Sequence, residues 1–239
     1  ILPDAWSLLG VVEWNSKSPQ TRCQQLRTIN DIVEMGIMRS AIGPFVIAAA
    51  VTVVIGLGVR LDPFFPGDVG AARAVQSAAP DPQPWALPVS ALAPPPARYV
   101  ILGLALVASI WMAGWRGLTV ALLVILAEQY GAESTKELFR RPRPSSNLIT
   151  VFGNPSGYSF PSTTITFFAA TFGTVGMLAL MAKKAPYRFA VAALCFLMLV
   201  IGGVARVALG LHWPSDVLLT VVICLLWIWA LARVVLSAP

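Results

Sequence analysis

The chain has 239 residues, of which 57% are hydrophobic and only 12% are charged. Soluble domains usually contain about 45–50% apolar and about 25% charged residues, so this composition excludes an ordinary soluble protein and indicates an integral membrane protein. The net charge is +6, but the basic residues stand in short clusters between apolar runs. This pattern argues against a nucleic-acid-binding protein.

The first element in chain order is a polar flank at residues 1–40. It is too polar to contain the apolar region of a cleavable signal peptide, and we expect a cytoplasmic or interfacial segment. Residues 24–39 place apolar side chains at helical spacing. That spacing predicts either an interfacial helix before the first span or an ordinary cytoplasmic flank.

Residues 41–239 are predicted to form one membrane domain. A bilayer core about 30 Å thick needs about 20 apolar residues in a helix, and five or six segments qualify. Counting all of them gives spans at residues 41–59, 99–115, 118–134, 161–182, 189–205 and 214–236, with a tight turn at 115–117. The fold class predicted is therefore an all-α integral membrane protein with six transmembrane helices in one bundle.

The stretch 61–98 is rich in proline and alanine. Such punctuation disfavours a further span, so we expect an extracytoplasmic loop with at most one short interfacial helix. Lysine and arginine in the short loops favour a cytoplasmic N-terminus. The loops after the third and fifth spans then face outward, which predicts a site on the periplasmic or exterior side of a bacterial inner (plasma) membrane.

One of these outward loops begins with an unusual cluster of cations, "KELFRRPRPSS" at residues 136–146. Lys136 and Arg143 from this cluster, together with Arg206 after the fifth span, are predicted to lie at one membrane face. Arginine binds phosphate oxygens through paired hydrogen bonds and lysine adds a point charge, so these cations suit one dianionic group. Glu133 lies three residues before Lys136 and is expected to pair with it.

Two further groups stand on the same predicted side. Ser162, near a helix N-terminus, offers a hydroxyl and backbone N–H donors to an anion. His212 is the only histidine of the chain, and Asp216 follows it by one helical turn. A carboxylate that holds one imidazole nitrogen leaves the other free for nucleophilic attack.

The pattern Lys-x6-Arg-Pro, then Pro-Ser-Thr-Thr at 161–164, then Arg-x5-His-x3-Asp at 206–216 resembles the type 2 phosphatidic acid phosphatase (lipid phosphate phosphatase) family, which is related to the vanadium haloperoxidases. The resemblance runs from about residue 68 to the C-terminus. It implies that His212 is the nucleophile that forms a phosphohistidine and that Asp216 orients it. It also implies a reaction without metal or cofactor and phosphate binding by Lys136, Arg143, Ser162, Thr163 and Arg206.

The chain departs from the family pattern at two positions. Ala205 replaces a serine, and Thr164 stands where the family has its general-acid histidine. A threonine hydroxyl cannot usefully donate a proton near pH 7, and a lost general acid typically costs about 10²–10⁴-fold in rate. A pyrophosphate leaving group needs less protonation, and we expect Arg140 and Arg141 to take up its charge.

The resemblance therefore favours a metal-independent lipid phosphate or pyrophosphate phosphatase. Candidate substrates are polyprenyl pyrophosphate, phosphatidate and phosphatidylglycerophosphate. Two alternatives stay open: a catalytically impaired relative that binds phospholipid headgroups, and a lipid phosphotransferase. The expected partners are a lipid phosphate substrate and membrane lipids, without nucleic acid.

Overall fold

The computed structural model describes residues 18, 20, 42–62, 65–182 and 186–237. Two units are distinguished, residues 1–43 and 44–239, and the second contains nearly all of the elements below. The predictions for residues 1–40 lie almost entirely outside the described residues. Within the described ranges the secondary structure is helical throughout, which confirms the all-α fold class.

Five helical stretches are long and apolar enough to cross a membrane, which confirms an integral membrane protein. They comprise Ile42–Leu61, α5 (Ala97–Phe139), the stretch Thr163–Met181, α8 (Arg188–Ala208) and α9 (Pro214–Ser237). The stretch Thr163–Met181 consists of α6 (Thr163–Phe168), a π-helical turn η1 (Ala169–Gly173) and α7 (Thr174–Met181).

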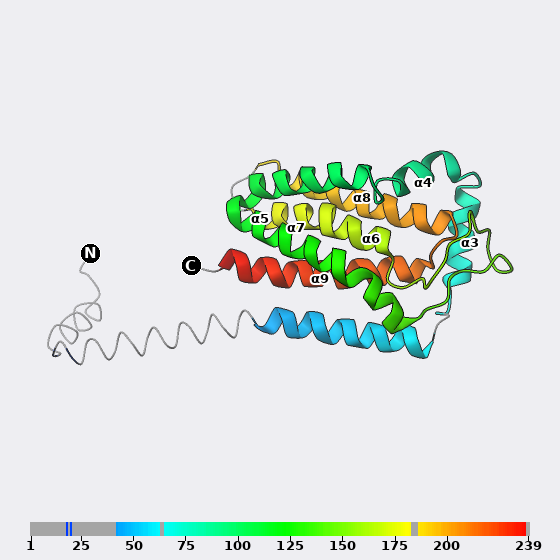
Figure 1. Cartoon of the computed structure of the whole chain (residues 1–239), viewed down its shortest axis with the longest axis horizontal. Helices are drawn as coiled ribbons and strands as arrows, with labels where there is room; N and C mark the ends of the chain where they lie inside the picture. Colours follow the sequence, from blue (N-terminus) through cyan, green and yellow to red (C-terminus); the bar gives the residue numbers. More distant parts are fainter. Residues whose placement is uncertain (1–17, 19, 21–41, 63–64, 183–185, 238–239) are drawn as a thin grey trace, which may run out of the picture. The chain divides into compact units, whose positions relative to one another are not determined.

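The 43-residue α5 is a hairpin of two helices, so these five stretches provide six spans (Figure 1). Its backbone leaves the helical region at Ala113 and at Gly114, where φ is 61°. Arg98 also hydrogen-bonds Glu128 at 2.5 Å, although residues 30 positions apart in a straight helix would be about 45 Å apart. The turn lies at 113–114, slightly before the predicted 115–117, because Gly114 adopts the positive φ that glycine favours while Gly117 stays helical.

The region between the first span and α5 contains two helices, α3 (Asp68–Ala78) and α4 (Gln83–Ser90), where at most one had been expected. Both pack on α8, and each buries an alanine completely, Ala72 and Ala86. Proline occurs in the first turn of α4, where its missing N–H costs no helical hydrogen bond. Proline therefore starts a short helix here, and the described residues of this region contain no helix long enough to span a membrane.

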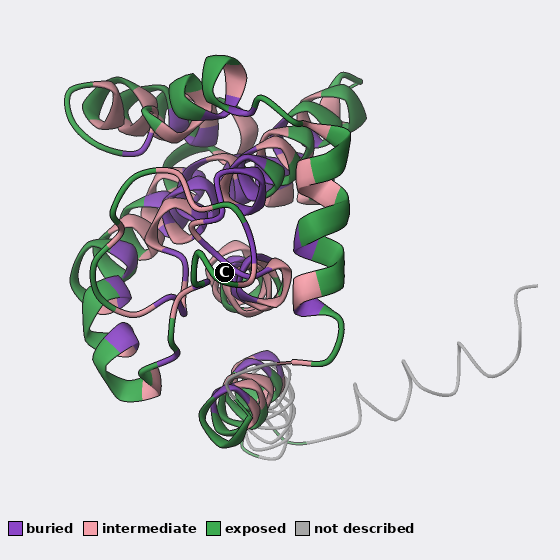
Figure 2. Ribbon diagram, turned by 90° about the vertical axis from the view of Figure 1, so that its right-hand side faces the viewer, coloured by how far each residue is buried: buried purple, intermediate pink, exposed green. Residues whose placement is uncertain are grey.

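The stretch Thr163–Met181 forms the centre of the bundle. Two thirds of its apolar window is buried (67%), against 22% for Ile42–Leu61 and 28% for α9. Close packing is possible because Gly202 of α8 lies directly against the Phe168 ring, where a Cβ would collide. Figure 2 shows the buried residues concentrated on the inner part of the bundle. Large apolar side chains such as Val107 and Val200 are exposed, as expected for lipid contact.

Four helix ends meet at one end of the bundle, namely the C-termini of α5 and α8 and the N-termini of α6 and α9 (Figure 1). The C-terminus of α7 and the N-terminus of α8 lie at the opposite end. The alternating direction of the helices places the three sequence motifs together. The first motif lies at and after the end of α5, the second at the start of α6, and the third in the connection from α8 to α9.

Candidate active site

His212 lies in the short connection between α8 and α9 and is 1% exposed. The chain reverses at Gly210, where φ is 67° and a Cβ would collide with the Thr150 carbonyl. Asp216, in the first turn of α9, places Oδ2 3.7 Å from His212 Nδ1. That distance is too long for a hydrogen bond, and Nδ1 has no hydrogen-bond partner within the described part of the chain.

Asp216 is itself held firmly. Its Oδ2 accepts a hydrogen bond from the Trp213 backbone N–H at 2.9 Å, so the α9 N-terminus orients the carboxylate through its own first turn. Burial lowers the pKa of His212 to about 4, and Arg206 and Arg143 contribute to this lowering while Asp216 opposes it. The imidazole is therefore neutral at physiological pH and has a lone pair available for attack.

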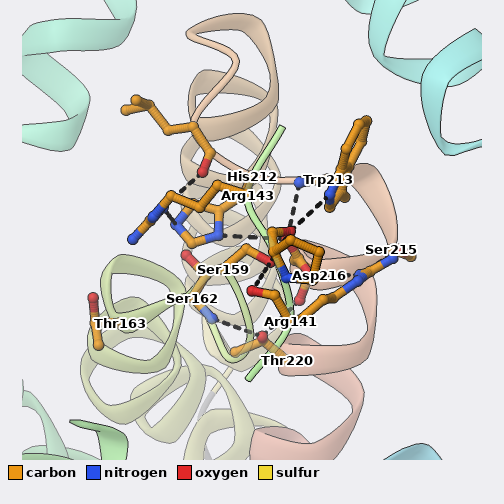
Figure 3. Close-up of polar contacts among 12 residues, drawn as sticks. Arg141, Arg143, Ser159, Ser162, Thr163, His212, Trp213, Ser215, Asp216 and Thr220 are labelled. Carbon is orange, nitrogen blue, oxygen red and sulfur yellow. Dashed lines mark hydrogen bonds and ion pairs between the residues drawn. The ribbon is translucent and has the colours of Figure 1, made fainter. Parts of the chain in front are cut away.

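Arg143 lies directly beside the histidine (Figure 3). Its Nη1 is 3.4 Å from His212 Nε2 and donates to the Leu211 carbonyl at 2.7 Å. Its Nε donates to the Ser156 carbonyl at 3.0 Å. Burial lowers the pKa of Arg143. The backbone contacts hold the guanidinium where an anion in front of His212 would meet it.

The other predicted phosphate-binding residues surround the same end of the bundle. Lys136 Nζ lies 3.1 Å from Glu133 Oε1, which confirms the expected ion pair, and 3.4 Å from Thr163 Oγ1. The Ser162 backbone N–H donates to Thr220 Oγ1 at 3.2 Å, which ties the start of α6 to α9.

Three buried polar atoms in this site lack a hydrogen-bond partner among the described residues, namely Ser162 Oγ, Arg206 Nε and His212 Nδ1. A buried polar group without a partner costs about 1–3 kcal/mol, so such groups are uncommon in folded proteins. Ser162 Oγ and Arg206 Nε are therefore available to an anion, whereas His212 Nδ1 faces Asp216 Oδ2.

Thr163 and Thr164, in the first turn of α6, line a cavity of about 880 Å³ together with Arg206. Arg98 and Glu128 line the same cavity at its α5 wall. Thr164 is half-buried, and its side chain borders this open space.

Arg140 and Arg141 differ from the sequence prediction, which treated both as cations available to a leaving group. Arg141 is 0% exposed, and its guanidinium is bound to the carboxylates of Asp68 and Asp216. Arg140 is exposed and turns Nε toward the Glu137 carbonyl at 3.0 Å.

Asp68 was not predicted from the sequence. It is one of three aspartates in the proline-rich stretch 61–98, and only its buried position beside Arg141 and Ser215 distinguishes it. No local signal in the sequence separates Arg141 from its arginine neighbours, because the difference lies in what each side chain contacts.

The comparisons with known proteins agree with this architecture. The chain is similar to the crystal structure described as the first transmembrane PAP2 type phosphatidylglycerolphosphate phosphatase from Bacillus subtilis, with a TM-score of 0.56 and 20% identity over 81% of this chain and 94% of that chain. No curated protein matches the chain. The model of the PAP2 superfamily matches residues 117–238, slightly more than half of the chain and all three motifs. The resemblance found in the sequence is thereby confirmed, and the chain belongs to the PAP2 superfamily.

Proposed function

We propose that the protein is a membrane phosphatase for lipid phosphates or pyrophosphates that acts through a phosphohistidine at His212. The observation that carries this proposal is the pair of unpartnered buried atoms Ser162 Oγ and Arg206 Nε, together with the Arg143 guanidinium 3.4 Å from His212 Nε2. A tetrahedral phosphate offers several acceptor oxygens at once. It therefore matches the Ser162 hydroxyl and the two guanidinium groups better than a planar carboxylate does.

In the first step, the Nε2 lone pair of neutral His212 attacks phosphorus. A nitrogen–phosphorus bond forms while the bond from phosphorus to the leaving oxygen breaks. Asp216, with Oδ2 facing Nδ1, stabilises the positive charge that develops on the imidazole. In the second step, water attacks phosphorus, the nitrogen–phosphorus bond breaks, and phosphate and neutral imidazole are released.

The leaving group determines which substrates this site handles best. An alkoxide needs a proton as it departs, and Thr164 cannot supply one near neutral pH. The leaving group of a pyrophosphate is a phosphate monoester, whose second pKa is near 6, so it departs without a general acid if cations take up its charge. Arg206 lines the cavity that Thr164 faces and takes that role in place of Arg141, whereas Arg98 in the same cavity is paired with Glu128.

We therefore favour a lipid pyrophosphate, such as a polyprenyl pyrophosphate, over phosphatidate as the substrate. Phosphatidylglycerophosphate is a further candidate because the Bacillus subtilis protein of similar fold is described as its phosphatase. We place the protein in a bacterial inner membrane with His212 on the periplasmic side, because lysine and arginine in the short loops favour that orientation.

The test is phosphate release by purified protein from polyprenyl pyrophosphate, phosphatidate and phosphatidylglycerophosphate. Wild type is compared with His212→Ala and with Asp81→Asn, an exposed control. We expect wild type and the control to release phosphate and to form an acid-labile phosphoprotein. The His212→Ala variant should neither release phosphate nor form the phosphoprotein. Release that is unaffected by His212→Ala would refute the mechanism.

Other outcomes favour the alternatives. Thr164 is the specific observation behind a headgroup-binding protein, and binding of these lipids without turnover by wild type would favour that function. Phosphate that appears on an added lipid alcohol instead of in solution would identify a phosphotransferase.

A further inference from the structure

A buried network of charged side chains lies behind the proposed nucleophile. Arg141 follows α5, Asp68 begins α3, and Asp216 lies in the first turn of α9. All three are buried, with Arg141 and Asp216 completely inaccessible. Taking charges out of water is costly unless each is paired and hydrogen-bonded, so this network calls for an explanation beyond folding.

The guanidinium of Arg141 divides its donors between Asp216, labelled with it in Figure 3, and Asp68. Nη1 donates to Asp216 Oδ1 at 2.5 Å, and Nη2 donates to Asp68 Oδ2 at 2.8 Å. Because Arg141 binds Oδ1 of Asp216, Oδ2 is the oxygen that accepts the Trp213 N–H and faces His212 Nδ1. Arg141 and the Trp213 N–H therefore set the direction of the Asp216 carboxylate together.

Asp68 holds this arrangement in place from the other side. Its Oδ1 accepts the Ser215 backbone N–H at 3.0 Å, and its Oδ2 accepts the Ser215 hydroxyl at 2.6 Å. The Ser215 hydroxyl also accepts a hydrogen bond from Arg141 at 2.8 Å. Asp68 thus fixes both the guanidinium and the N-terminus of α9, the helix that carries Asp216.

The balance of charge gives Asp68 a second effect. Arg141 and Asp216 alone would form a neutral pair, while the imidazole of His212 faces two cations, Arg143 and Arg206. With Asp68 included, the network carries a net negative charge next to the histidine. Positive charge develops on the imidazole during attack. A carboxylate that Arg141 does not fully neutralise then stabilises this charge.

We propose that Asp68 is a positioning residue that acts through Arg141 to keep Asp216 Oδ2 directed at His212 Nδ1 and negatively charged. Asp68 contacts neither the substrate nor the reacting nitrogen. The inference rests on the proposed function of His212 as nucleophile, and it assigns a catalytic effect to α3, an element outside the three motifs.

The single histidine of the chain makes a direct test available. Protein labelled with ¹⁵N-histidine and purified through a tag without histidine gives one imidazole in NMR spectra recorded against pH. The spectra report which ring nitrogen carries the proton and the pKa of the ring, and they require no substrate. In wild type we expect the proton on Nδ1 and a lone pair on Nε2.

Asp68→Asn removes the charge and one acceptor while keeping the shape of the side chain. We expect a mixture of the two tautomers and a pKa of His212 lower than in wild type, because the imidazolium loses a nearby negative charge. We expect kcat to fall about tenfold to hundredfold, the cost of a misplacement of about 1 Å in a catalytic group. Asp81→Asn, an exposed acid between α3 and α4, should change none of these quantities.

A folded Asp68→Asn protein with the wild-type tautomer, pKa and kcat would overturn the proposal. Should that variant not fold, Ser215→Ala removes the hydroxyl that donates to Asp68 Oδ2 and accepts from Arg141 while leaving every buried charge paired. Because Asp68 is then held less firmly, we expect mixed tautomers and reduced kcat. Wild-type tautomer and kcat there would also overturn it.

The two proposals fail in different ways. A protein with the expected tautomers that releases no phosphate would contradict the proposed function and support the positioning by Asp68. A folded Asp68→Asn variant that forms phosphohistidine normally and keeps the wild-type tautomer and pKa would support the proposed function and contradict the positioning by Asp68.

Discussion

Restoring the family's histidine at position 164 is expected to change which substrates the protein prefers. Thr164 is half-buried and faces a cavity of about 880 Å³ that Arg206 also lines, so an imidazole fits there without displacing the core. A general acid typically contributes about 10²–10⁴-fold, equivalent to about 3–5 kcal/mol of the barrier. We expect Thr164→His to recover most of this factor for phosphatidate, whose leaving group is an alkoxide.

The same substitution should leave pyrophosphate hydrolysis nearly unchanged, because a departing phosphate monoester gains little from a proton near neutral pH. The assay is the initial rate of phosphate release from phosphatidate and polyprenyl pyrophosphate at pH 6.5. Thr164→Asn is the matched control, since it adds bulk and polarity without a titrating group. Adding His212→Ala to Thr164→His should abolish the gain.

Two results would refute the leaving-group argument. One is a wild-type protein that cleaves phosphatidate faster than the pyrophosphate. The other is a Thr164→His variant in which both substrates gain by the same factor, because a general acid that helps both equally is not compensating for a poor leaving group.

Three further predictions concern binding, pH and topology. Arg206→Ala should weaken inhibition by vanadate roughly ten- to hundredfold, the effect of losing charged hydrogen bonds. The control Arg233→Ala, at an exposed position, should leave inhibition unchanged. Equal inhibition constants for wild type and Arg206→Ala would show that Arg206 does not bind the anion. Burial holds the pKa of His212 near 4, so the imidazole stays neutral until the pH approaches that value. We therefore expect kcat/KM, corrected for substrate ionisation, to stay level from pH 7 to about pH 5 and to fall only toward pH 4. A decline centred near pH 6.5 would contradict a buried nucleophile. Single cysteines at Asn147 and Pro186 should react with a membrane-impermeant maleimide from opposite sides of the membrane, and labelling of both from one side would contradict the six-span arrangement.

The sequence alone was sufficient to predict the fold class and to predict that the three motifs lie close together. Apolar runs of membrane length predict spanning helices because the bilayer core offers no partner for an exposed backbone group. Once the spans alternate in direction, the motifs around Lys136, Ser162 and His212 must meet at one membrane face. The expected pairing of Glu133 with Lys136 was also correct, since residues three apart on a helix are neighbours whatever surrounds them.

The tertiary structure decided the features that depend on distant partners. The prolines around α4 start a helix because that helix can pack on α8, and no local signal distinguishes this from a loop. Arg141 looks like Arg140 in the sequence, yet it binds Asp68 and Asp216, which stand 73 and 75 residues away. Charge and hydropathy are properties of each residue and can be read along the chain. Whether a charged group meets solvent, a substrate or a buried carboxylate depends on which helices pack around it.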